Sequence, residues 1–174
     1  SSVKVHLNSG DIVEADKALI AVGVQGNVED LGLEECNIAV EKGWIKVNEY
    51  LETSLAGVYA IGDVAGPPWL AHKASAEGII ASEHIAGLNP NPMKYDNIPG
   101  CTYCHPEVAS VGFTEKAAKE KGYEIKIGNF PFRGLGKSMA VGDTDGFVKV
   151  IYDAKYGEML GCHIIGAEAT NLIT

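Results

Sequence analysis

A short apolar stretch that ends in a glycine and a single carboxylate restricts the fold of this chain more than any other segment. It covers residues 58–63, in which apolar residues flank Tyr59 and are followed by Gly62 and Asp63. This pattern predicts a short buried strand with an aspartate at its C-terminal end, where open α/β sheets bind ligands. Glycine lets a ligand approach the backbone, and a carboxylate accepts hydrogen bonds from hydroxyl groups. We expect Asp63 to bind sugar-like hydroxyls, and a turn-capping role for Asp63 is the alternative.

The segment that follows has the periodicity of a helix and favours the ligand site. Apolar or small residues recur at spacings of three and four over residues 70–86. Pro67 and Pro68 precede this segment and Gly87 follows it, as is typical of helix ends. The small side chains along the helix would allow close approach to a sheet or a ligand.

The remaining pattern predicts a mixed fold, with α/β and α+β parts. A hairpin is expected over residues 3–15, around Ser9 and Gly10. Further strands are expected at 18–22, 44–48, 101–105, 108–111, 124–132, 147–153 and 159–165. Thr114 is expected to cap a helix over 115–121. The Asn-Pro-Asn-Pro segment at 89–92 indicates a domain linker near 88–94.

Composition and charge exclude several classes of protein. Hydrophobic residues make up 46% of the 174 residues and charged residues 21%, which is ordinary for a globular chain with a packed core. The net charge of −9 argues against a nucleic-acid partner. No apolar run approaches the roughly 18 residues of a membrane helix, so no membrane partner is expected. No basic-then-apolar signal opens the chain.

The cysteines predict neither a disulfide scaffold nor a metal site. Four cysteines are scattered along the chain, which favours a reducing compartment. Residues 101–105 match the C-x-x-C-H pattern of c-type haem attachment. If this segment is a strand, however, Cys101 and Cys104 point to opposite faces and cannot share a haem or a metal. We expect an ordinary strand here.

Several separate motifs, in order, resemble the flavoprotein pyridine nucleotide-disulfide oxidoreductases, also called flavoprotein disulfide reductases. Residues 58–63 followed by 70–74 are similar to the second FAD-binding segment of this family. Residues 105–112 and 142–149 resemble its dimerisation domain. The Leu-Ala-His-Lys-Ala form of the second segment, with residues 161–166, is most similar to the dihydrolipoamide dehydrogenase branch.

The resemblance implies cofactor roles for specific residues. Asp63 matches the aspartate that binds the ribityl hydroxyls of FAD. Four residues match the segment along the flavin, which acts largely through its backbone; they are Trp69, Leu70, Ala71 and His72. For His72 an ordinary helix start is the alternative. Gly23 matches a glycine that lines the NAD site. A helix beginning here would direct its positive end at the flavin, favouring the reduced anionic ring.

The resemblance also implies a domain organisation and partners. Residues 1–25 would be the end of the NAD-binding domain, 26–93 a central FAD-contacting domain and 94–174 most of an interface domain. We expect a homodimer through the interface domain, with 98–165 as the partner surface. The other partner would be the lipoyl-bearing protein of a 2-oxoacid dehydrogenase or glycine cleavage complex. The expected compartment is the cytoplasm, or the mitochondrial matrix in a eukaryote.

Elements of the family's active site are missing from this sequence. The chain lacks a G-x-G-x-x-G loop, the redox-active Cys-x4-Cys pair and the C-terminal His-Pro pair with its downstream glutamate. Residues 105–107 are not that catalytic pair, because the glutamate follows directly. We therefore expect a C-terminal piece of a longer enzyme, with no catalytic residue of its own.

The expected function has two forms. The parent enzyme would oxidise protein-bound dihydrolipoamide, with electrons passing through a disulfide and FAD to NAD+. By itself, the chain would be a catalytically silent dimerisation and cofactor-contact module. Another disulfide reductase, such as a mercuric or glutathione reductase, is the alternative parent.

Overall fold

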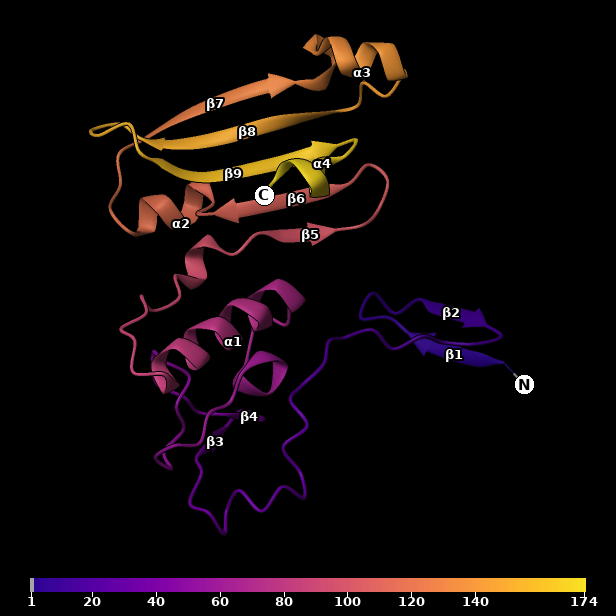
Figure 1. Ribbon diagram of the computed structural model, residues 1–174. Coiled ribbons are helices and arrows are strands. Elements are labelled where there is room, and N and C mark those ends of the chain that lie inside the picture. The colour runs from indigo at the N-terminus through magenta and orange to yellow at the C-terminus, as the bar shows by residue number, and fades with distance from the viewer. Residues whose placement is uncertain (1) are drawn as a thin grey trace. The chain divides into compact units, whose positions relative to one another are not determined.

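The computed structural model describes residues 2–174, and the chain divides into two compact units (Figure 1). The first unit ends at Asn91 and the second begins at Pro92. Each unit has a hydrophobic core of its own. The functional division into 1–25, 26–93 and 94–174 stays a prediction. None of the helices within residues 2–174 is long and apolar enough to cross a membrane.

The first unit contains one long helix, and the rest is short strands and turns. Its elements are β1 (Val3–His6), β2 (Ile12–Ala15), β3 (Val40–Glu41), β4 (Trp44–Ile45), the 3-10 helix η1 (Gly62–Ala65) and α1 (Ala71–Ile85). The strands β1 and β2 form the predicted hairpin, and β3 pairs with β4. A small core lies around Ile38, Ile45 and Ala60.

Two strand predictions in the first unit are wrong. Residues 18–22 form no strand, because no described strand offers them a hydrogen-bonding partner. Their side chains are exposed, with Leu19 at 92% and Val22 at 93%. Residues 58–61 pair with their neighbours through one bridge only, from Glu52 to Tyr59. Asp63 therefore lies in η1 and not at the end of a strand.

The predicted helix is confirmed as α1, and two of its buried residues are charged. The helix begins at Ala71 and ends at Ile85. Its buried residues are Lys73, Glu77 and Ala81, whereas Ile85 is 65% exposed. The apolar periodicity missed this face because two of its three buried positions are charged.

The second unit is a five-stranded antiparallel sheet with short helices, which confirms the expected mixed fold. Its elements are η2 (Tyr95–Asn97), β5 (Gly100–Thr102), β6 (Val108–Gly112), α2 (Glu115–Glu120), β7 (Ile125–Pro131), η3 (Phe132–Gly134), α3 (Gly136–Val141), β8 (Gly146–Asp153), β9 (Met159–Gly166) and α4 (Ala169–Leu172). The strand order is β5-β6-β9-β8-β7. Thr114 caps α2 as predicted, accepting a hydrogen bond from the Ala117 amide.

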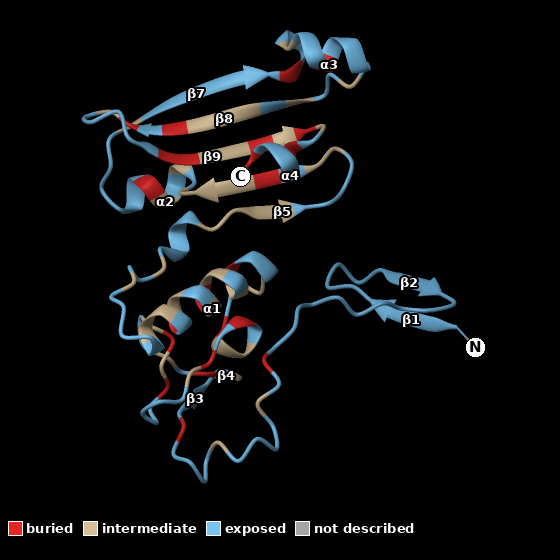
Figure 2. Cartoon of the chain, viewed as in Figure 1, coloured by how far each residue is buried: buried red, intermediate tan, exposed pale blue. Residues whose placement is uncertain are grey.

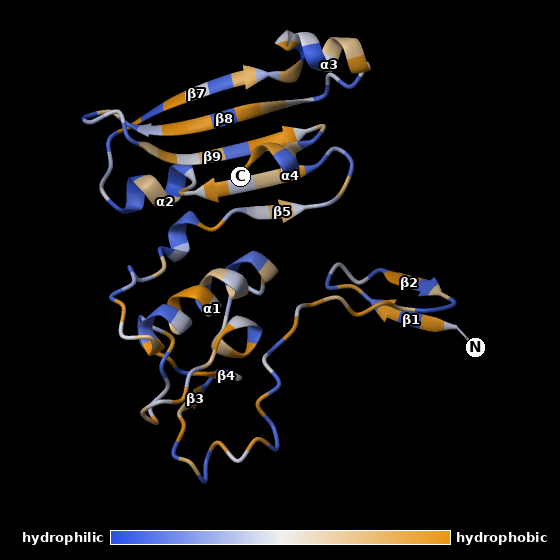
Figure 3. Ribbon diagram, in the orientation of Figure 1, coloured by the Kyte–Doolittle hydropathy of each residue, from blue (hydrophilic) through white to orange (hydrophobic). Residues whose placement is uncertain are grey.

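The core of the second unit consists of two clusters. In one, α4 packs Ala169 against Ala109 and Ile164. In the other, α2 packs Ala118 against Ile151 and Leu160. Figure 2 shows the buried parts of the strands and helices in red, and Figure 3 shows the apolar stretches of β8 and β9. One cluster thus includes α4 and the other includes α2.

Candidate functional site: the turn before helix α1

A tight turn brings the predicted carboxylate next to the start of α1. Gly62 begins η1 with a φ of 73°, a backbone conformation that residues other than glycine rarely adopt. The turn closes with a hydrogen bond of 3.2 Å from the Gly66 amide to the Asp63 carbonyl. The Asp63 side chain is exposed. The backbone of the turn is therefore hydrogen-bonded, while the Asp63 carboxylate is exposed to solvent.

Close packing explains two further glycines of this site. A Cβ at Gly26 would lie 2.8 Å from the Gly43 carbonyl and 3.2 Å from the Val64 Cα. A Cβ at Gly66, where φ is 100°, would lie 3.1 Å from the Trp44 ring. Gly26 and Trp44, which are distant from this turn in the sequence, thus pack closely against it. The sequence reading missed Gly26, because nothing near it in the sequence reveals this contact.

The N terminus of α1 has no side-chain cap. Leu70 is the N-cap and makes no side-chain capping hydrogen bond. No acidic residue lies in the first turn of the helix. The first amides of a helix have no partner within the helix, and they carry roughly half a positive charge together. The segment predicted to lie along a flavin is therefore this exposed positive helix end.

A buried ion pair joins α1 to the Asp63 turn. The Lys73 Nζ lies 2.9 Å from the Glu77 Oε1, and both side chains are 1% exposed. The Lys73 Nζ donates hydrogen bonds to the carbonyls of Gly62 and Gly66, at 3.0 and 2.8 Å. The Glu77 Oε2 accepts a hydrogen bond of 2.7 Å from the Gly62 amide. The sequence reading missed both residues, although a lysine and a glutamate four apart on a helix rich in small residues were the available signal.

Trp69 carries a buried polar atom without a partner. Within the described residues, its Nε1 has no hydrogen-bond acceptor although the atom is shielded from solvent. Buried indole N–H groups normally find a partner. Leu70 is half-buried, whereas Ala71 and His72 are exposed at the start of α1. The residues predicted at 63 and 69–72 thus lie in η1 and at the start of α1, two elements that contact each other.

Gly23 does not belong to this cluster. It is exposed with φ of 116°, and a Cβ built there would meet no atom within 4 Å. Its place in an NAD site stays a prediction.

The C-x-x-C-H segment shows no metal-binding arrangement. The strand β5 ends at Thr102, so the argument that Cys101 and Cys104 face opposite sides of one strand is wrong. Instead, the Cys104 thiol donates to the Pro106 carbonyl at 3.1 Å. Within residues 2–174, no three histidine, cysteine or acidic side chains lie close enough together to hold a metal ion.

The glutamate of the His-Pro-Glu segment has a structural partner. The Glu107 Oε2 accepts hydrogen bonds from the hydroxyl and the amide of Thr170, at 2.6 and 2.9 Å. These hydrogen bonds hold the pKa of Glu107 below its usual value of 4.5, and the hydrogen bond from the Thr170 hydroxyl has the larger effect. Glu107 thereby ties the start of β6 to α4.

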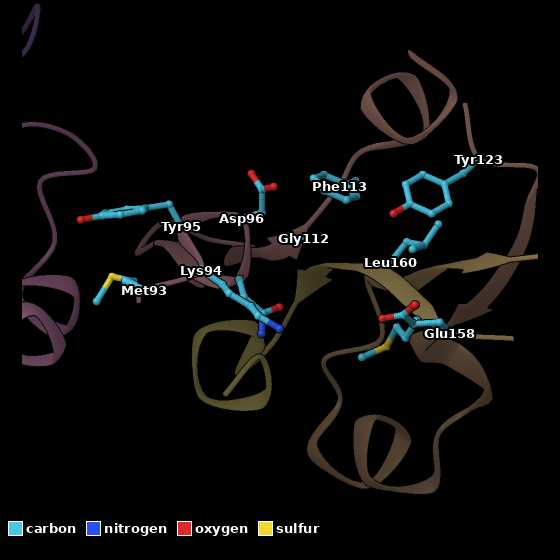
Figure 4. A pocket seen from close by; sticks show the side chains of 11 residues that line it. Met93, Lys94, Tyr95, Asp96, Gly112, Phe113, Tyr123, Glu158 and Leu160 are labelled. Atoms are coloured by element: carbon cyan, nitrogen blue, oxygen red, sulfur yellow. The ribbon is translucent and has the colours of Figure 1, made fainter. Parts of the chain in front are cut away.

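The second unit has a hollow of about 500 Å³ whose lining includes none of these predicted residues (Figure 4). Eleven residues line it: Met93, Lys94, Tyr95, Asp96, Asn97, Gly112, Phe113, Tyr123, Glu158, Met159 and Leu160. Its lining includes side chains of both charges and three aromatic rings.

Two family models match consecutive parts of the chain. Residues 1–78 match the pyridine nucleotide-disulphide oxidoreductase model. Residues 98–174 match the dimerisation domain of the same class of enzymes. The first match lies within the first unit of the structure, and the second match lies within the second unit.

Curated relatives resemble the chain over nearly its whole length. It is 51% identical to the dihydrolipoyl dehydrogenase of Rhizobium etli over 99% of the chain and 37% of the relative. It is 53% identical to that of Zymomonas mobilis over 90% of the chain, and 49% identical to that of Bacillus subtilis over 92%. In both cases it covers 34% of the relative. The chain thus spans about a third of the length of these relatives.

Solved structures share the fold at lower identity. LpdA from Mycobacterium tuberculosis superposes with a TM-score of 0.89 and 27% identity, covering 98% of this chain and 37% of LpdA. RclA, an HOCl-induced flavoprotein disulfide reductase from Escherichia coli, superposes with a TM-score of 0.88 and 27% identity. That match covers 99% of this chain and 40% of RclA.

Proposed function

Because the chain belongs to the pyridine nucleotide-disulphide oxidoreductase family, we propose that it is part of a dihydrolipoyl dehydrogenase. The parent enzyme would oxidise protein-bound dihydrolipoamide, passing electrons through an active disulfide and FAD to NAD+. The observation that carries this proposal is the identity of 51% with the Rhizobium etli dihydrolipoyl dehydrogenase along 99% of the chain. RclA, a different flavoprotein disulfide reductase, is only 27% identical.

The residues around the Asp63 turn fit a bound FAD. The exposed Asp63 carboxylate, the uncapped start of α1 and the unpartnered Trp69 Nε1 lie in one part of the first unit. A flavin with its polyol chain presents hydroxyls for a carboxylate and acceptor atoms for helix amides and an indole N–H. The donor and acceptor groups of this chain thus match what such a cofactor offers.

Each residue would have a distinct task at this site. Asp63 would accept hydrogen bonds from the ribityl hydroxyls and set the position of the polyol. The backbone of residues 69–72 would lie along the flavin, and the positive end of α1 would favour negative charge on the ring. Gly23 would leave room for the nicotinamide cofactor. FAD, when bound, supplies the two-electron chemistry between the dithiol and NAD+.

The second unit would form the homodimer and complete the enzyme. Its match to the dimerisation domain supports this role. On one face of its sheet, Val148 and Val150 are half-buried and Tyr152 is 37% exposed, so part of an apolar surface is left open. The lipoyl-bearing protein of a 2-oxoacid dehydrogenase or glycine cleavage complex would be the second partner. Four free cysteines support a reducing compartment, the cytoplasm or the mitochondrial matrix.

Flavin retention in the full-length protein tests the FAD site. Asp63→Ala should weaken FAD binding roughly 10- to 100-fold, because a hydrogen bond to a charged group contributes about 1.5–3 kcal/mol. Asp30→Asn is the matched control, since Asp30 is exposed in the same unit and its φ of 56° suits asparagine. Titration of the FAD-free protein, followed by flavin fluorescence, gives the dissociation constants. An Asp63→Ala protein that binds FAD as tightly as the control would contradict the proposal.

The isolated chain should be catalytically silent. It contains neither the Cys-x4-Cys pair nor a G-x-G-x-x-G loop. We expect purified 1–174 to be colourless and to lack diaphorase activity. A flavin absorbance band that stays with the chain through gel filtration would overturn this part of the proposal.

A further inference from the structure

The Lys73–Glu77 pair of α1 is buried at a place where general physical arguments disfavour it. Taking two charges out of water costs free energy that their attraction rarely exceeds, and apolar replacements are often neutral or stabilising. Lys73 also lies in the first turn of α1, where the helix dipole disfavours a cation. The stability of the helix therefore does not explain why this pair is present.

Hydrogen bonds of the pair converge on the turn that contains Asp63. Lys73 binds the carbonyls at both ends of the turn, Gly62 and Gly66. Glu77 binds the amide of Gly62, so both backbone polar groups of this glycine are held by the pair. Asp63 lies between the two anchored glycines. The pair thus fixes the backbone on either side of the carboxylate while leaving the carboxylate itself exposed.

We propose that Lys73 and Glu77 are positioning residues, which hold the 62–66 turn so that Asp63 is preorganised for the hydroxyls of the cofactor. This inference rests on the proposed FAD site. Preorganisation matters because a ligand that must order a loose turn loses that ordering entropy from its binding free energy. The pair would therefore act on cofactor affinity through Asp63, without touching the cofactor.

The chain offers a matched control for this pair. Lys116 and Glu120 have the same spacing on α2, but they are 3.9 Å apart and their side chains are 85% and 66% exposed. The test variant is Lys73→Met with Glu77→Leu, which removes both buried charges together and so avoids leaving one unpaired. The control variant is Lys116→Met with Glu120→Leu.

Hydrogen exchange of the FAD-free full-length protein gives a readout independent of the cofactor. We expect the Gly62 and Gly66 amides to exchange faster in the Lys73/Glu77 variant, while the middle of α1 keeps its protection. The Lys116/Glu120 variant should leave the turn unchanged. Equal exchange of the turn in both variants would overturn the inference, because the pair would then not hold the turn.

A double-mutant cycle on FAD affinity distinguishes positioning from general structural support. The Lys73/Glu77 variant should bind FAD roughly tenfold more weakly or worse. When Asp63→Ala is already present, the same pair substitution should have a much smaller effect, because residues that act through one another are not additive. Effects that simply multiply would contradict a positioning role.

The same cycle separates this inference from the proposed function. If Asp63→Ala weakens FAD binding but the Lys73/Glu77 variant does not, the inference is wrong and the FAD site stands. If Asp63→Ala leaves FAD affinity unchanged, the proposed site itself is wrong, and with it the positioning role.

Discussion

The two units of the chain are held together in different ways. In the second unit, long strands such as β8 and β9 pair over most of their length, and apolar side chains of the sheet form two buried clusters. In the first unit, the strands β3 and β4 have two residues each, and the turn at Asp63 is anchored by charged side chains. Regular strand pairing and apolar packing thus stabilise the second unit, whereas individual polar contacts hold the Asp63 turn of the first unit.

The two lysine–glutamate pairs show the same difference at one spacing. Lys73 and Glu77 are 1% exposed and bind the backbone of a turn. Lys116 and Glu120 extend into solvent at 3.9 Å from each other. Exposed pairs contribute little to stability, whereas breaking one member of a buried pair is costly. Burial, and not sequence spacing, therefore decides what such a pair does.

The largest expected effect comes from removing one member of the buried pair. Lys73→Met leaves the Glu77 carboxylate and two backbone carbonyls without their cation, and it should lower the free energy of unfolding of the first unit by about 3–5 kcal/mol. Both tryptophans, Trp44 and Trp69, lie in the first unit, so urea unfolding followed by tryptophan fluorescence reports on it.

Lys116→Met is the control for this prediction, and it should change stability by less than about 1 kcal/mol. Similar losses from both substitutions would remove the distinction between the two pairs.

In the second unit, the largest effect should come from packing. Ile151 is fully buried, and Ile151→Ala should lower the free energy of unfolding by about 2–5 kcal/mol through lost contacts and a cavity. Its cross-strand partner Ile127 is 47% exposed, so Ile127→Ala should cost much less. Hydrogen exchange of the β8 and β9 amides measures both. Equal losses at the two positions would show that the sheet does not depend on this cluster.

The difference between the units also explains what the sequence could predict. In the second unit, alternation located β7, β8 and β9, and Thr114 marked the start of α2, because these signals act over neighbouring residues. In the first unit, the pattern at 18–22 predicted a strand that is absent, because an apolar run does not reveal whether a pairing strand exists.

The site itself was predictable only in part. Asp63 and the start of α1 were found from the order of residues along the chain. The contacts of Gly26 with the turn, and of Lys73 and Glu77 with its backbone, join segments through space. A charged residue on a helix normally indicates a solvent-facing side, so the buried pair contradicts the usual reading of hydrophobic periodicity.

A smaller effect tests whether local signals also stabilise the second unit. Thr114 accepts a hydrogen bond of 3.2 Å from the Ala117 amide at the start of α2. Thr114→Ala should therefore lower stability by about 0.5–2 kcal/mol, and Thr114→Ser should restore most of it. The measurement is urea unfolding followed by far-ultraviolet circular dichroism. A serine variant as unstable as the alanine variant would show that the hydroxyl is not the stabilising group.

The smallest effect concerns pH at the contact between Glu107 and α4. Hydrogen bonds from Thr170 hold the pKa of Glu107 below its usual value of 4.5. A carboxylate with a lowered pKa adds stability that is complete above the unfolded value and is lost as the pH falls through the folded value. Protection of the Thr170 amide against hydrogen exchange should therefore hold down to about pH 5 and decrease below pH 4.5.

Glu107→Gln separates this titration from general acid unfolding. The glutamine carbonyl can still accept the hydrogen bonds of Thr170, but it does not titrate, so the acid-dependent loss at the Thr170 amide should disappear. Glu120→Gln is the control, because Glu120 is exposed on α2, a different helix of the same unit. An unchanged acid profile in the Glu107→Gln protein would mean that another group loosens α4. In that case a titrating group other than Glu107 would stabilise α4 in the second unit.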